Sequence, residues 1–530
     1  MTHRAKTRPP LGADTAPVVE TAPEEISRWL EDAAHFPGGH AAGIVFPRSE
    51  KDVATMLRDH PTVLPIGAQS SLTGGATPAG ELIVSFARMS HVLDMADDRV
   101  RTEPGVTLAA LQDALDSHGL FYPPVPTFAG ATIGGTIATN AAGAATFKYG
   151  STRAWVEGLT VVLSCGEVLD LTRGQVFAHP EGYFDIDTSS RSVRVPVPHY
   201  RLPDVPKCSA GYHAAPEMDL VDLFVGSEGT LGIVTGAILR VVHRTDTFAV
   251  AFVPMSSEAD AFALTAELRH RAQATWSSHD RNGLDLPAIE YIDRRSLALV
   301  PPRLLTAAGV KPGTTDQAAL FVQIALPSTM TAEQAYAQIA SFQQTATPLA
   351  EFCRLLSRFG AFDRTEIALP GDRKRAAQIF EIREAVPAAV NELVGAAKRT
   401  MGPVVEKIAG DMIVPFEQLG AMVRTARTGF ERRGLDHAIW GHVSDGNLHP
   451  NVIPQSVNDV RAGKEAILEL GREVAKLGGC PLAEHGVGRS AVKQELLRQL
   501  YGDAGIQAMR EVKRALDPEW KLSPGVLFPK

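Results

Sequence analysis

Cysteine is scarce in this chain, and its scarcity narrows the range of possible cofactors. The 530 residues include only Cys165, Cys208, Cys353 and Cys480, and no two of them are spaced as Cys-x-x-Cys. The sequence therefore offers neither a ligand run for an iron–sulfur cluster nor a cysteine-rich zinc site. The scattered positions also give no sign of a disulfide framework, so a reducing compartment is expected.

Other signatures are missing as well. No apolar run approaches the roughly 18 residues of a membrane span, and the polar, Pro-rich start lacks the apolar core of a secretory signal. Neither G-x-G-x-x-G nor G-x-x-x-x-G-K-[ST] occurs, so the fingerprints of Rossmann-type dinucleotide binding and P-loop phosphate transfer are absent. We expect a cytoplasmic protein, or one that is peripheral at a membrane.

Basic residues are fewer than acidic ones. The chain has 52 basic and 60 acidic residues, a formal net charge of -8, and no long basic run, which argues against nucleic acid as the main partner. Apolar residues make up 45% and charged residues 21%, which is typical of a soluble globular enzyme. A chain of this length is too long for one core, so two or more domains are expected.

Glycine and other small residues, in contrast, are concentrated in three stretches. These are GAQSSLTGGATP (67–78), ATIGGTIATNAAGAATFKYG (131–150) and GSEGTLGIVT (226–235), the last following a strand predicted at Leu223–Val225. Such backbones can approach a phosphate closely, and the Ser and Thr hydroxyls add donors. Each stretch alone could be a surface turn or a tightly packed segment, but three together favour a cradle for a large ligand.

The second half of the chain has a different pattern. Strand-like 247–254 precedes a helix at 256–271, and strand-like 319–326 precedes a helix at 331–345. A long helical pattern follows at 373–394. This recurrence predicts an α+β domain in which helices flank an antiparallel sheet.

A short segment, GHVSDGNLHPNV, has the strongest local signal. Asp445-Gly446 predicts a two-residue hairpin turn, which would place His442 directly opposite His449. Opposed residues share one face of the hairpin, so the two imidazoles could share a divalent metal with further ligands. The alternative is a hairpin with two partly exposed histidines.

A second polar pair follows a predicted helix at 458–477. Glu484 and His485 are adjacent in the loop CPLAEHGVGRS, where two glycines and Arg489 follow them. Such a pair is often simply on the surface. In a Gly-rich loop after a helix, however, the two side chains could be directed at a site.

In order and spacing, the three glycine-rich stretches, GHVSDGNLHPNV and AEHGVG resemble one family. They are similar to the FAD-dependent D-2-hydroxyacid dehydrogenases of the vanillyl-alcohol-oxidase-type fold, over roughly residues 38–528. That group includes D-lactate dehydrogenase, the glycolate oxidase flavoprotein subunit and D-2-hydroxyglutarate dehydrogenase. The resemblance implies an α+β, two-domain flavoprotein with a PCMH-type FAD-binding domain and a cap domain.

The resemblance also implies a division of the chain. Residues 1–37 would form an N-terminal arm with a short helix, and 38–244 the FAD-binding domain. Residues 245–478 would form the substrate or cap domain, and 479–530 a C-terminal segment that packs on the FAD domain. The last two together, 245–530, would be the FAD-linked oxidase C-terminal region.

Cofactor contacts follow from the same resemblance. FAD would lie on the glycine-rich stretches and meet Pro65, Gly67, Ala68, Gln69, Ser70, Ser71, Leu72, Thr73, Gly74, Thr132, Gly134, Gly135, Ala138, Asn140, Gly143, Glu228, Gly229, Gly232, Ile233 and Asn447. The family's first loop usually reads Gly-Gly-Gly-Thr-Ser, whereas Ala68, Gln69 and Ser70 stand in this one. Backbone donors survive that change. Since no His lies in this loop, it cannot supply a covalent flavin link, and noncovalent FAD is expected.

In the family, the two hairpin histidines and the Glu of AEHG bind one divalent metal, often zinc or manganese. This implies His442, His449 and Glu484 as metal ligands here. The histidine that follows that Glu serves as the catalytic base, which implies His485.

Substrate contacts are implied at three more positions. The Asn two residues beyond the second metal histidine corresponds to Asn451, and the Arg of the cap helix that binds the substrate carboxylate corresponds to Arg383. Some members also use a Lys, for which Lys407 is the nearest match and Lys398 an alternative. Some place a hydroxyl residue four positions after the Arg, where this chain has Pro387, so the distal end of the substrate stays open.

Together these parts predict a reaction. A metal-bound 2-hydroxy acid would lose its hydroxyl proton to His485 and its C2 hydrogen, as hydride, to flavin N5, while Arg383 holds the carboxylate. Electrons would then pass to a separate protein, a quinone or oxygen, and a homodimer or an oxidase complex is conceivable. Two alternatives stay open: an alkyl-glycerone-phosphate-synthase-like FAD transferase, and a non-catalytic flavoprotein subunit of an oxidase complex.

Overall fold

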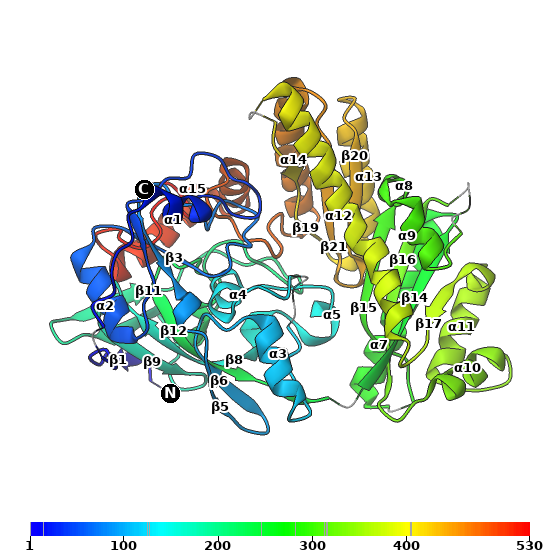
Figure 1. Ribbon diagram of the computed structural model, residues 1–530, viewed down its shortest axis with the longest axis horizontal. Coiled ribbons are helices and arrows are strands. Elements are labelled where there is room, and N and C mark those ends of the chain that lie inside the picture. Colours follow the sequence, from blue (N-terminus) through cyan, green and yellow to red (C-terminus); the bar gives the residue numbers. More distant parts are fainter. Residues whose placement is uncertain are drawn as a thin grey trace. The chain divides into compact units, whose positions relative to one another are not determined.

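The structure is a computed structural model that describes residues 2–13, 15–124, 126, 128–244, 246–280, 282–311, 313, 316–402 and 405–530. The chain divides into two compact units (Figure 1). Unit 1 comprises Met1–Gly143, Gly150–Arg244 and Cys480–Lys530, whereas unit 2 comprises Ala144–Tyr149 and Thr245–Gly479. Both ends of the chain therefore belong to unit 1.

A parallel three-stranded sheet forms one part of unit 1. Its order is β2 (Gly43–Val45), β4 (Leu82–Ser85), β3 (Val63–Ile66). Helix α2 (Glu50–Asp59) begins at Ser49, whose side chain caps it by accepting from the Asp52 N–H. The C-terminal tail joins this sheet, because Val63 N–H donates to the Lys521 carbonyl at 2.8 Å and Leu522 is in the same core.

A five-stranded antiparallel sheet forms a second part of unit 1. Its order is β5 (Val92–Met95), β6 (Arg99–Thr102), β12 (Ile233–Arg240), β8 (Val156–Val162), β9 (Val168–Thr172). The smaller strands are β1 (Arg4–Lys6), β10 (Tyr183–Asp187) and β11 (Ser192–Pro196) in one sheet, and β7 (Leu120–Phe121) with β13 (Val242–His243) in another. The other helices of unit 1 are α1 (Pro23–Ile26), α3 (Leu108–Asp116), α4 (Ile133–Thr139), α6 (Leu220–Phe224) and α15 (Ala491–Leu516).

One predicted strand is wrong. Leu223–Val225 was expected to be extended, but Leu220–Phe224 form the helix α6. The side chain of Asp219 accepts a hydrogen bond from the Val221 N–H at 2.9 Å and so begins the helix. Three apolar residues in a row do not distinguish a strand from a buried helix, and the capping Asp decides the outcome.

The described residues of unit 2 form an eight-stranded sheet that is antiparallel throughout. Its path is β17 (Glu366–Ala368), β14 (Asp246–Met255), β16 (Ala318–Pro327), β15 (Asp285–Asp293), β20 (His437–His442), β21 (Asn447–Val452), β18 (Ile408–Ala409), and β19 (Met412–Ile413) also pairs with β21. The helices of unit 2 are α5 (Thr146–Tyr149), α7 (Glu258–Ser278), α8 (Arg294–Leu299), α9 (Pro302–Ala307), α10 (Ala332–Ala340), α11 (Pro348–Arg358), α12 (Arg373–Met401), α13 (Leu419–Glu431) and α14 (Val457–Lys476).

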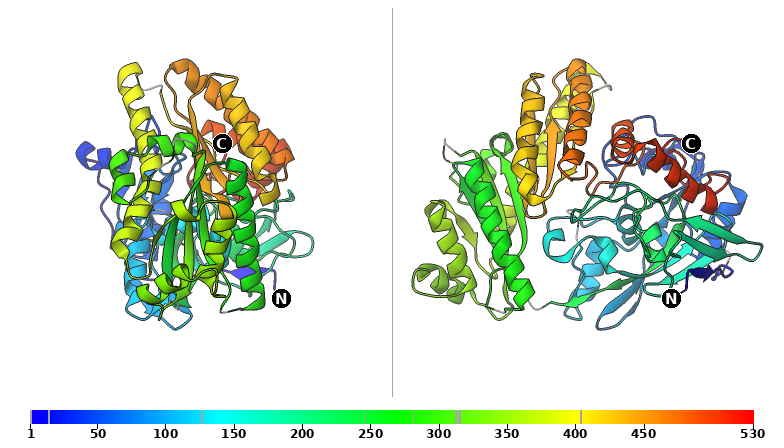
Figure 2. Two further views of the ribbon diagram at one scale, coloured as in Figure 1. Left: turned by 90° about the vertical axis from the view of Figure 1, so that its right-hand side faces the viewer. Right: turned by 180° about the vertical axis from the view of Figure 1, so that it is seen from behind.

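Helices α7 and α12 cover opposite faces of this sheet (Figure 2). On β15, Tyr291 contacts Glu258 of α7, while its neighbour Glu290 contacts Arg383 of α12. Adjacent strand residues point to opposite faces, so the two helices must lie on opposite sides. The α12 face is the one that carries the polar residues described below.

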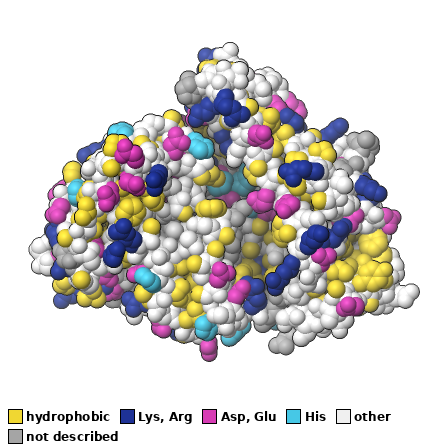
Figure 3. All heavy atoms as spheres, in the orientation of Figure 1, with side chains coloured by type: hydrophobic (Ala, Val, Ile, Leu, Met, Phe, Trp, Pro, Cys, Tyr) yellow, Lys and Arg dark blue, Asp and Glu magenta, His cyan; other side chains and the backbone are white. Residues whose placement is uncertain are grey.

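Charged side chains of both signs are interspersed on the face of the molecule shown in Figure 3. This distribution agrees with the modest net charge of -8. Among the helices of the described ranges, none is both long and apolar enough to cross a membrane.

Candidate active site

A cavity of about 300 Å³ lies within unit 1, and all three glycine-rich stretches contribute to its wall. The predicted cofactor contacts that line it are Pro65, Gly67, Ala68, Gln69, Ser70, Ser71, Leu72, Thr132, Gly134, Gly135, Ala138, Glu228, Gly229, Gly232 and Ile233. Four further predicted contacts belong to unit 1 but do not line this wall as far as the described residues show: Thr73, Gly74, Asn140 and Gly143. Asn447 lies in unit 2.

Two kinds of glycine occur in this wall. A Cβ at Gly67 would collide with Oγ1 of Thr132, and one at Gly232 with Cγ1 of Val161, so close packing between segments requires glycine at both. Gly135 differs, because a Cβ there would meet only Thr132 Oγ1, at 3.2 Å. Packing alone does not require glycine at this position, whereas a ligand that closely approaches the backbone would.

Asn140, which was predicted to contact the cofactor, has a structural role at the end of a helix. It ends α4 in the left-handed conformation, with φ at 49°. Its side-chain oxygen accepts a hydrogen bond from the Arg153 N–H at 2.9 Å. This asparagine therefore shapes the chain next to the cavity.

Glu228 holds the loop that contains Glu484 and His485. Its two carboxylate oxygens accept from the N–H groups of Val487 and Gly488, each at 2.8 Å. Burial raises the pKa of Glu228 to about 7, although these two N–H groups act in the opposite direction. Its backbone is left-handed, with φ at 52°, which is uncommon for a residue with a side chain. The glycine-rich GSEG segment thus fixes the AEHGVG loop as well as the cavity.

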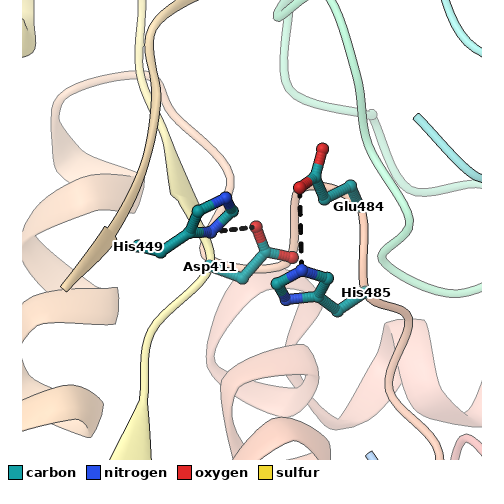
Figure 4. Close-up of side chains that lie close together, drawn as sticks. All are labelled: Asp411, His449, Glu484 and His485. Carbon is teal, nitrogen blue, oxygen red and sulfur yellow. Dashed lines mark ion pairs between the residues drawn. The ribbon is translucent and has the colours of Figure 1, made fainter. Parts of the chain in front are cut away.

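Glu484 and His485 both line the unit 1 cavity. Oε1 of Glu484 is 3.6 Å from Nε2 of His485 (Figure 4). Oε2 of Glu484 accepts from Nζ of Lys207 at 2.7 Å, and the Lys207 side chain is fully buried. Glu484 is therefore held by a lysine 277 positions earlier in the chain, which no local pattern in the sequence indicated.

The hairpin is present, but its predicted register is wrong. His442 is opposite Asn447 and His449 is opposite Trp440, because the connection is a 3-10 turn at Val443–Asp445 followed by Gly446, and not a two-residue turn. The shift is by two residues, which keeps every side chain on its face. The rings of His442 and His449 are accordingly still close, with centroids 5.4 Å apart and planes at 90°.

Glu290 of β15 links His442 to Arg383. Its Oε1 accepts a hydrogen bond from Nδ1 of His442, and its Oε2 accepts from Nε of Arg383 at 3.0 Å. Burial opposes ionisation of this carboxyl, but Arg383 and the hydrogen bond from His442 lower its pKa below the ordinary value. All three side chains are buried. A predicted metal ligand and a predicted substrate-binding residue therefore share one anionic partner, which the sequence reading missed.

Asp411 has a similar relation to His449. Its Oδ1 is 3.6 Å from Nδ1 of His449 (Figure 4) and accepts from Nδ2 of Asn447 at 3.2 Å. Asn451 donates from Nδ2 to the His449 carbonyl at 2.8 Å. The side-chain oxygens of Asn447 and Asn451 are buried and have no hydrogen-bond partner among the described residues. A buried polar atom without a partner costs free energy, so these oxygens mark a place where a ligand would be stabilised.

Lys407 lies on the same face of unit 2, next to the hairpin. Its Nζ is 5.9 Å from the centre of the Trp440 ring. Burial lowers the pKa of Lys407 to about 8, and no ion pair of this lysine is found within the described ranges. Lys398, the alternative candidate, lies in the last turn of α12.

Residues 255–527, more than half of the chain, match the profile of the FAD linked oxidases, C-terminal domain. The chain belongs to the FAD-linked oxidases. A second match, to the FAD binding domain, covers residues 41–172 of this FAD-linked oxidase. These matches confirm the two-domain flavoprotein fold class and identify the chain as an FAD-linked oxidoreductase.

Full-length relatives of this FAD-linked oxidase have related names. A D-2-hydroxyglutarate dehydrogenase of Stutzerimonas stutzeri is 29% identical over 524 residues, which cover 96% of each chain. A glycolate oxidase subunit GlcD of Bacillus subtilis is 27% identical over 498 residues, 92% of this chain and 89% of the relative. A D-lactate dehydrogenase of Archaeoglobus fulgidus is 25% identical over 525 residues, 97% and 98% of the two chains.

Two solved structures of an alkyldihydroxyacetonephosphate synthase share the fold of this oxidase. One has a TM-score of 0.59 at 15% identity and covers 92% of this chain and 77% of its own. The other has a TM-score of 0.57 at 14% identity, with 98% and 90% covered. At this identity the likeness concerns the fold alone.

The unit 1 cavity has features that suit FAD. Its wall combines glycine backbone, hydroxyl groups such as those of Ser70, Ser71 and Thr132, and apolar Phe86 and Phe224. This combination suits a ligand with both a pyrophosphate and a flat aromatic ring.

The polar face of unit 2 has donors that suit a divalent metal. Because Glu290 accepts from Nδ1 of His442, Nε2 is the nitrogen through which this histidine would coordinate. Oδ1 of Asp411 is 3.6 Å from Nδ1 of His449, which is too far for a hydrogen bond that would fix the coordinating nitrogen of this ring. Two imidazole nitrogens combined with a carboxylate oxygen suit zinc or manganese.

Proposed function

We propose that this FAD-linked oxidase converts a D-2-hydroxy acid of the D-lactate, glycolate or D-2-hydroxyglutarate class to the 2-oxo acid. The names of three full-length relatives support this substrate class. The observation that carries the proposal is the buried series Arg383–Glu290–His442. In this series Glu290 links two groups: the Arg383 guanidinium, which can bind a carboxylate, and the His442 imidazole, which can bind a metal. A 2-hydroxy acid requires these two groups at adjacent positions.

A divalent ion, zinc or manganese, would be held by His442, His449 and Glu484. Support comes from the 5.4 Å separation of the two rings and from the carboxylates of Glu290 and Asp411 beside their Nδ1 atoms. When bound, the metal would lower the pKa of the substrate hydroxyl, and FAD would accept the C2 hydrogen as hydride at N5.

The side chains of the protein would supply the remaining functions. Arg383 would bind the C1 carboxylate, with Glu290 fixing its orientation. His485 would accept the hydroxyl proton on a ring nitrogen, and Asn451 would contact the bound substrate. Lys407 would pair with a second carboxylate where the substrate has one.

Anaerobic titration of the purified flavoprotein tests this proposal. D-lactate, glycolate or D-2-hydroxyglutarate should bleach the visible flavin absorbance, and L-lactate should not. A transferase of the alkyl-glycerone-phosphate-synthase type uses FAD without net oxidation and should show no lasting bleaching. A non-catalytic subunit should not respond to any of these acids. Equal bleaching by D- and L-lactate would refute the predicted handedness.

The reduced flavin must pass its electrons to another molecule. Since the sequence has no Cys-x-x-Cys run, the acceptor would be a separate protein, a quinone or oxygen. Turnover with each class of acceptor, measured at a fixed concentration of the best acid, would identify it.

A further inference from the structure

Cys208 and Cys480 are 272 positions apart in the sequence, yet their sulfur atoms are 3.5 Å apart in unit 1. Neither is in a disulfide. Cys480 is buried, whereas the residue Cys208 as a whole is partly exposed. A thiol pair at this distance can form a disulfide once the sulfurs approach by about 1.5 Å, since an S–S bond is about 2.05 Å long.

The surroundings of Cys208 favour its thiolate. A hydrogen bond from Cys480 is the main cause that lowers the pKa of Cys208, and the Ala210 N–H contributes as well. The hydroxyl of Tyr501 is 4.0 Å from the same sulfur. The thiolate is the form that attacks an oxidant, so Cys208 is the expected site of first reaction.

The remaining two cysteines lack this arrangement. Burial raises the pKa of Cys353 to about 12 and also raises the pKa of Cys165. Cys165 is exposed, but reactivity depends on the thiolate as well as on exposure. These two cysteines therefore serve as internal controls.

The chain on both sides of Cys208 contacts the loop that contains Glu484. Lys207, next to Cys208, donates to Glu484 at 2.7 Å. Ser209, on the other side, donates its N–H to the Leu482 carbonyl at 3.0 Å. Both neighbours of Cys208 in the chain are therefore hydrogen-bonded to the loop that contains Glu484.

We propose that Cys208 and Cys480 are a site of reversible oxidation, at which a peroxide converts the two thiols to a disulfide. The Cys208 thiolate attacks hydrogen peroxide, an S–O bond forms, the O–O bond breaks, and hydroxide leaves and takes up a proton. Cys480 then attacks the sulfenic sulfur, the S–S bond forms, and the oxygen leaves as a second water. The two thiols lose two electrons, which reduce one peroxide, and a dithiol reductant reverses the change.

The disulfide would also weaken the hold of Lys207 on Glu484, because it pulls the neighbouring backbone toward Cys480. This consequence rests on the proposed function, in which Glu484 is a metal ligand. The chemistry at the two sulfurs does not depend on it.

Thiol counting and peptide mapping of the full-length, FAD-loaded protein test the proposal. After hydrogen peroxide and denaturation, the thiols per chain should fall from four to two. Mapping without reduction should find a linked peptide pair that contains Cys208 and Cys480, and dithiothreitol should restore all thiols. Four remaining thiols, or oxidation without a link between these two residues, would overturn the proposal.

Three variants refine this result. Cys165→Ser and Cys353→Ser should both keep the linked pair, whereas Cys480→Ser should leave Cys208 as a sulfenic acid that dimedone labels. If Cys480→Ser does not fold, the mapping of the wild-type protein still decides the matter. Metal content, measured before and after oxidation, should fall severalfold and recover on reduction. An unchanged metal content beside a mapped disulfide would refute only the consequence at Glu484.

Discussion

Arg383 donates from Nε to the carboxylate of Glu290 at 3.0 Å, and both side chains are buried. The same carboxylate accepts from Nδ1 of His442 on the adjacent strand. One buried anion therefore orients two groups that would otherwise rotate independently. A metal-binding histidine whose Nδ1 is fixed in this way presents Nε2 in a single direction.

Replacement of Glu290 tests this relationship. In Glu290→Gln the charge is lost while the shape is kept, so His442 and Arg383 lose their shared anion. We expect metal affinity to fall by about 10- to 100-fold and the KM for the acid to rise. Calorimetric metal titration and steady-state kinetics measure the two effects separately. Glu384→Gln is the matched control, because Glu384 also accepts from Arg383, at 3.0 Å, but its side chain is half exposed. If the two variants behave alike, Glu290 has no special positioning role.

Gly446 provides a second test, because it shapes the hairpin without being a ligand. Its φ is 85°, and an added Cβ would collide with the Val414 carbonyl. We expect Gly446→Val to cost on the order of 2–3 kcal/mol of folding free energy and to lose metal and turnover together. Thermal unfolding and elemental analysis measure these. Gly429→Ala, on α13 where an added Cβ meets nothing within 4 Å, should be close to neutral. Full metal occupancy in Gly446→Val would contradict the hairpin argument.

Gly135 separates cofactor binding from packing. Gly135→Leu adds a side chain at the cavity wall, where an added Cβ would meet only Thr132 Oγ1 within 4 Å among the described residues. We expect FAD content to drop by more than tenfold while the melting temperature of the apoprotein stays within a few degrees of wild type. Full FAD content in Gly135→Leu would show that no ligand approaches this wall.

Acid precipitation of the wild type should release all its flavin, since no His lies in the first loop. Flavin that stays in the pellet would disprove noncovalent binding.

Lys407 should discriminate between substrates by charge. Burial lowers its pKa to about 8, so it is cationic below that pH and neutral above it. The KM for D-2-hydroxyglutarate should therefore rise as the pH passes through about 8, while the KM for D-lactate should not. Lys407→Met should raise the KM for the dicarboxylate by about 10- to 100-fold at pH 7, which corresponds to the loss of one charge-assisted hydrogen bond. Lys398→Met is the comparison, and a larger effect there would assign the contact to Lys398.

Local patterns in the sequence predicted the elements of the site better than their connections. The Asp445-Gly446 pair correctly indicated a hairpin, although the turn holds four residues and not two. The error did little harm, since a shift by two residues keeps His442 and His449 on one face. A shift by one would have separated them.

The partners of the site residues could not be read in this way. Glu290 lies in an apolar strand, and Lys207 in a Pro-rich segment, far in sequence from Arg383 and Glu484. An ion pair between distant segments leaves no periodic pattern, because it depends on tertiary packing alone. Asp411, beside His449, was likewise not among the candidate residues that the sequence indicated. Local chemistry thus indicates candidate ligands, while the groups that orient them require the fold.

Metal removal should affect turnover but not FAD. The proposed metal ligands His442 and His449 are in unit 2, while the cavity that suits FAD is in unit 1. Dialysis against a chelator should therefore abolish turnover of a D-2-hydroxy acid and leave the flavin spectrum unchanged, and added zinc or manganese should restore activity.

His442→Ala should lose both metal and turnover. His485→Ala, the proposed base, should lose turnover by more than 100-fold yet keep its metal. Elemental analysis beside kinetics distinguishes the two variants. Turnover that survives chelation would show that the metal has no part in catalysis, and metal loss in His485→Ala would make His485 a ligand and not the base.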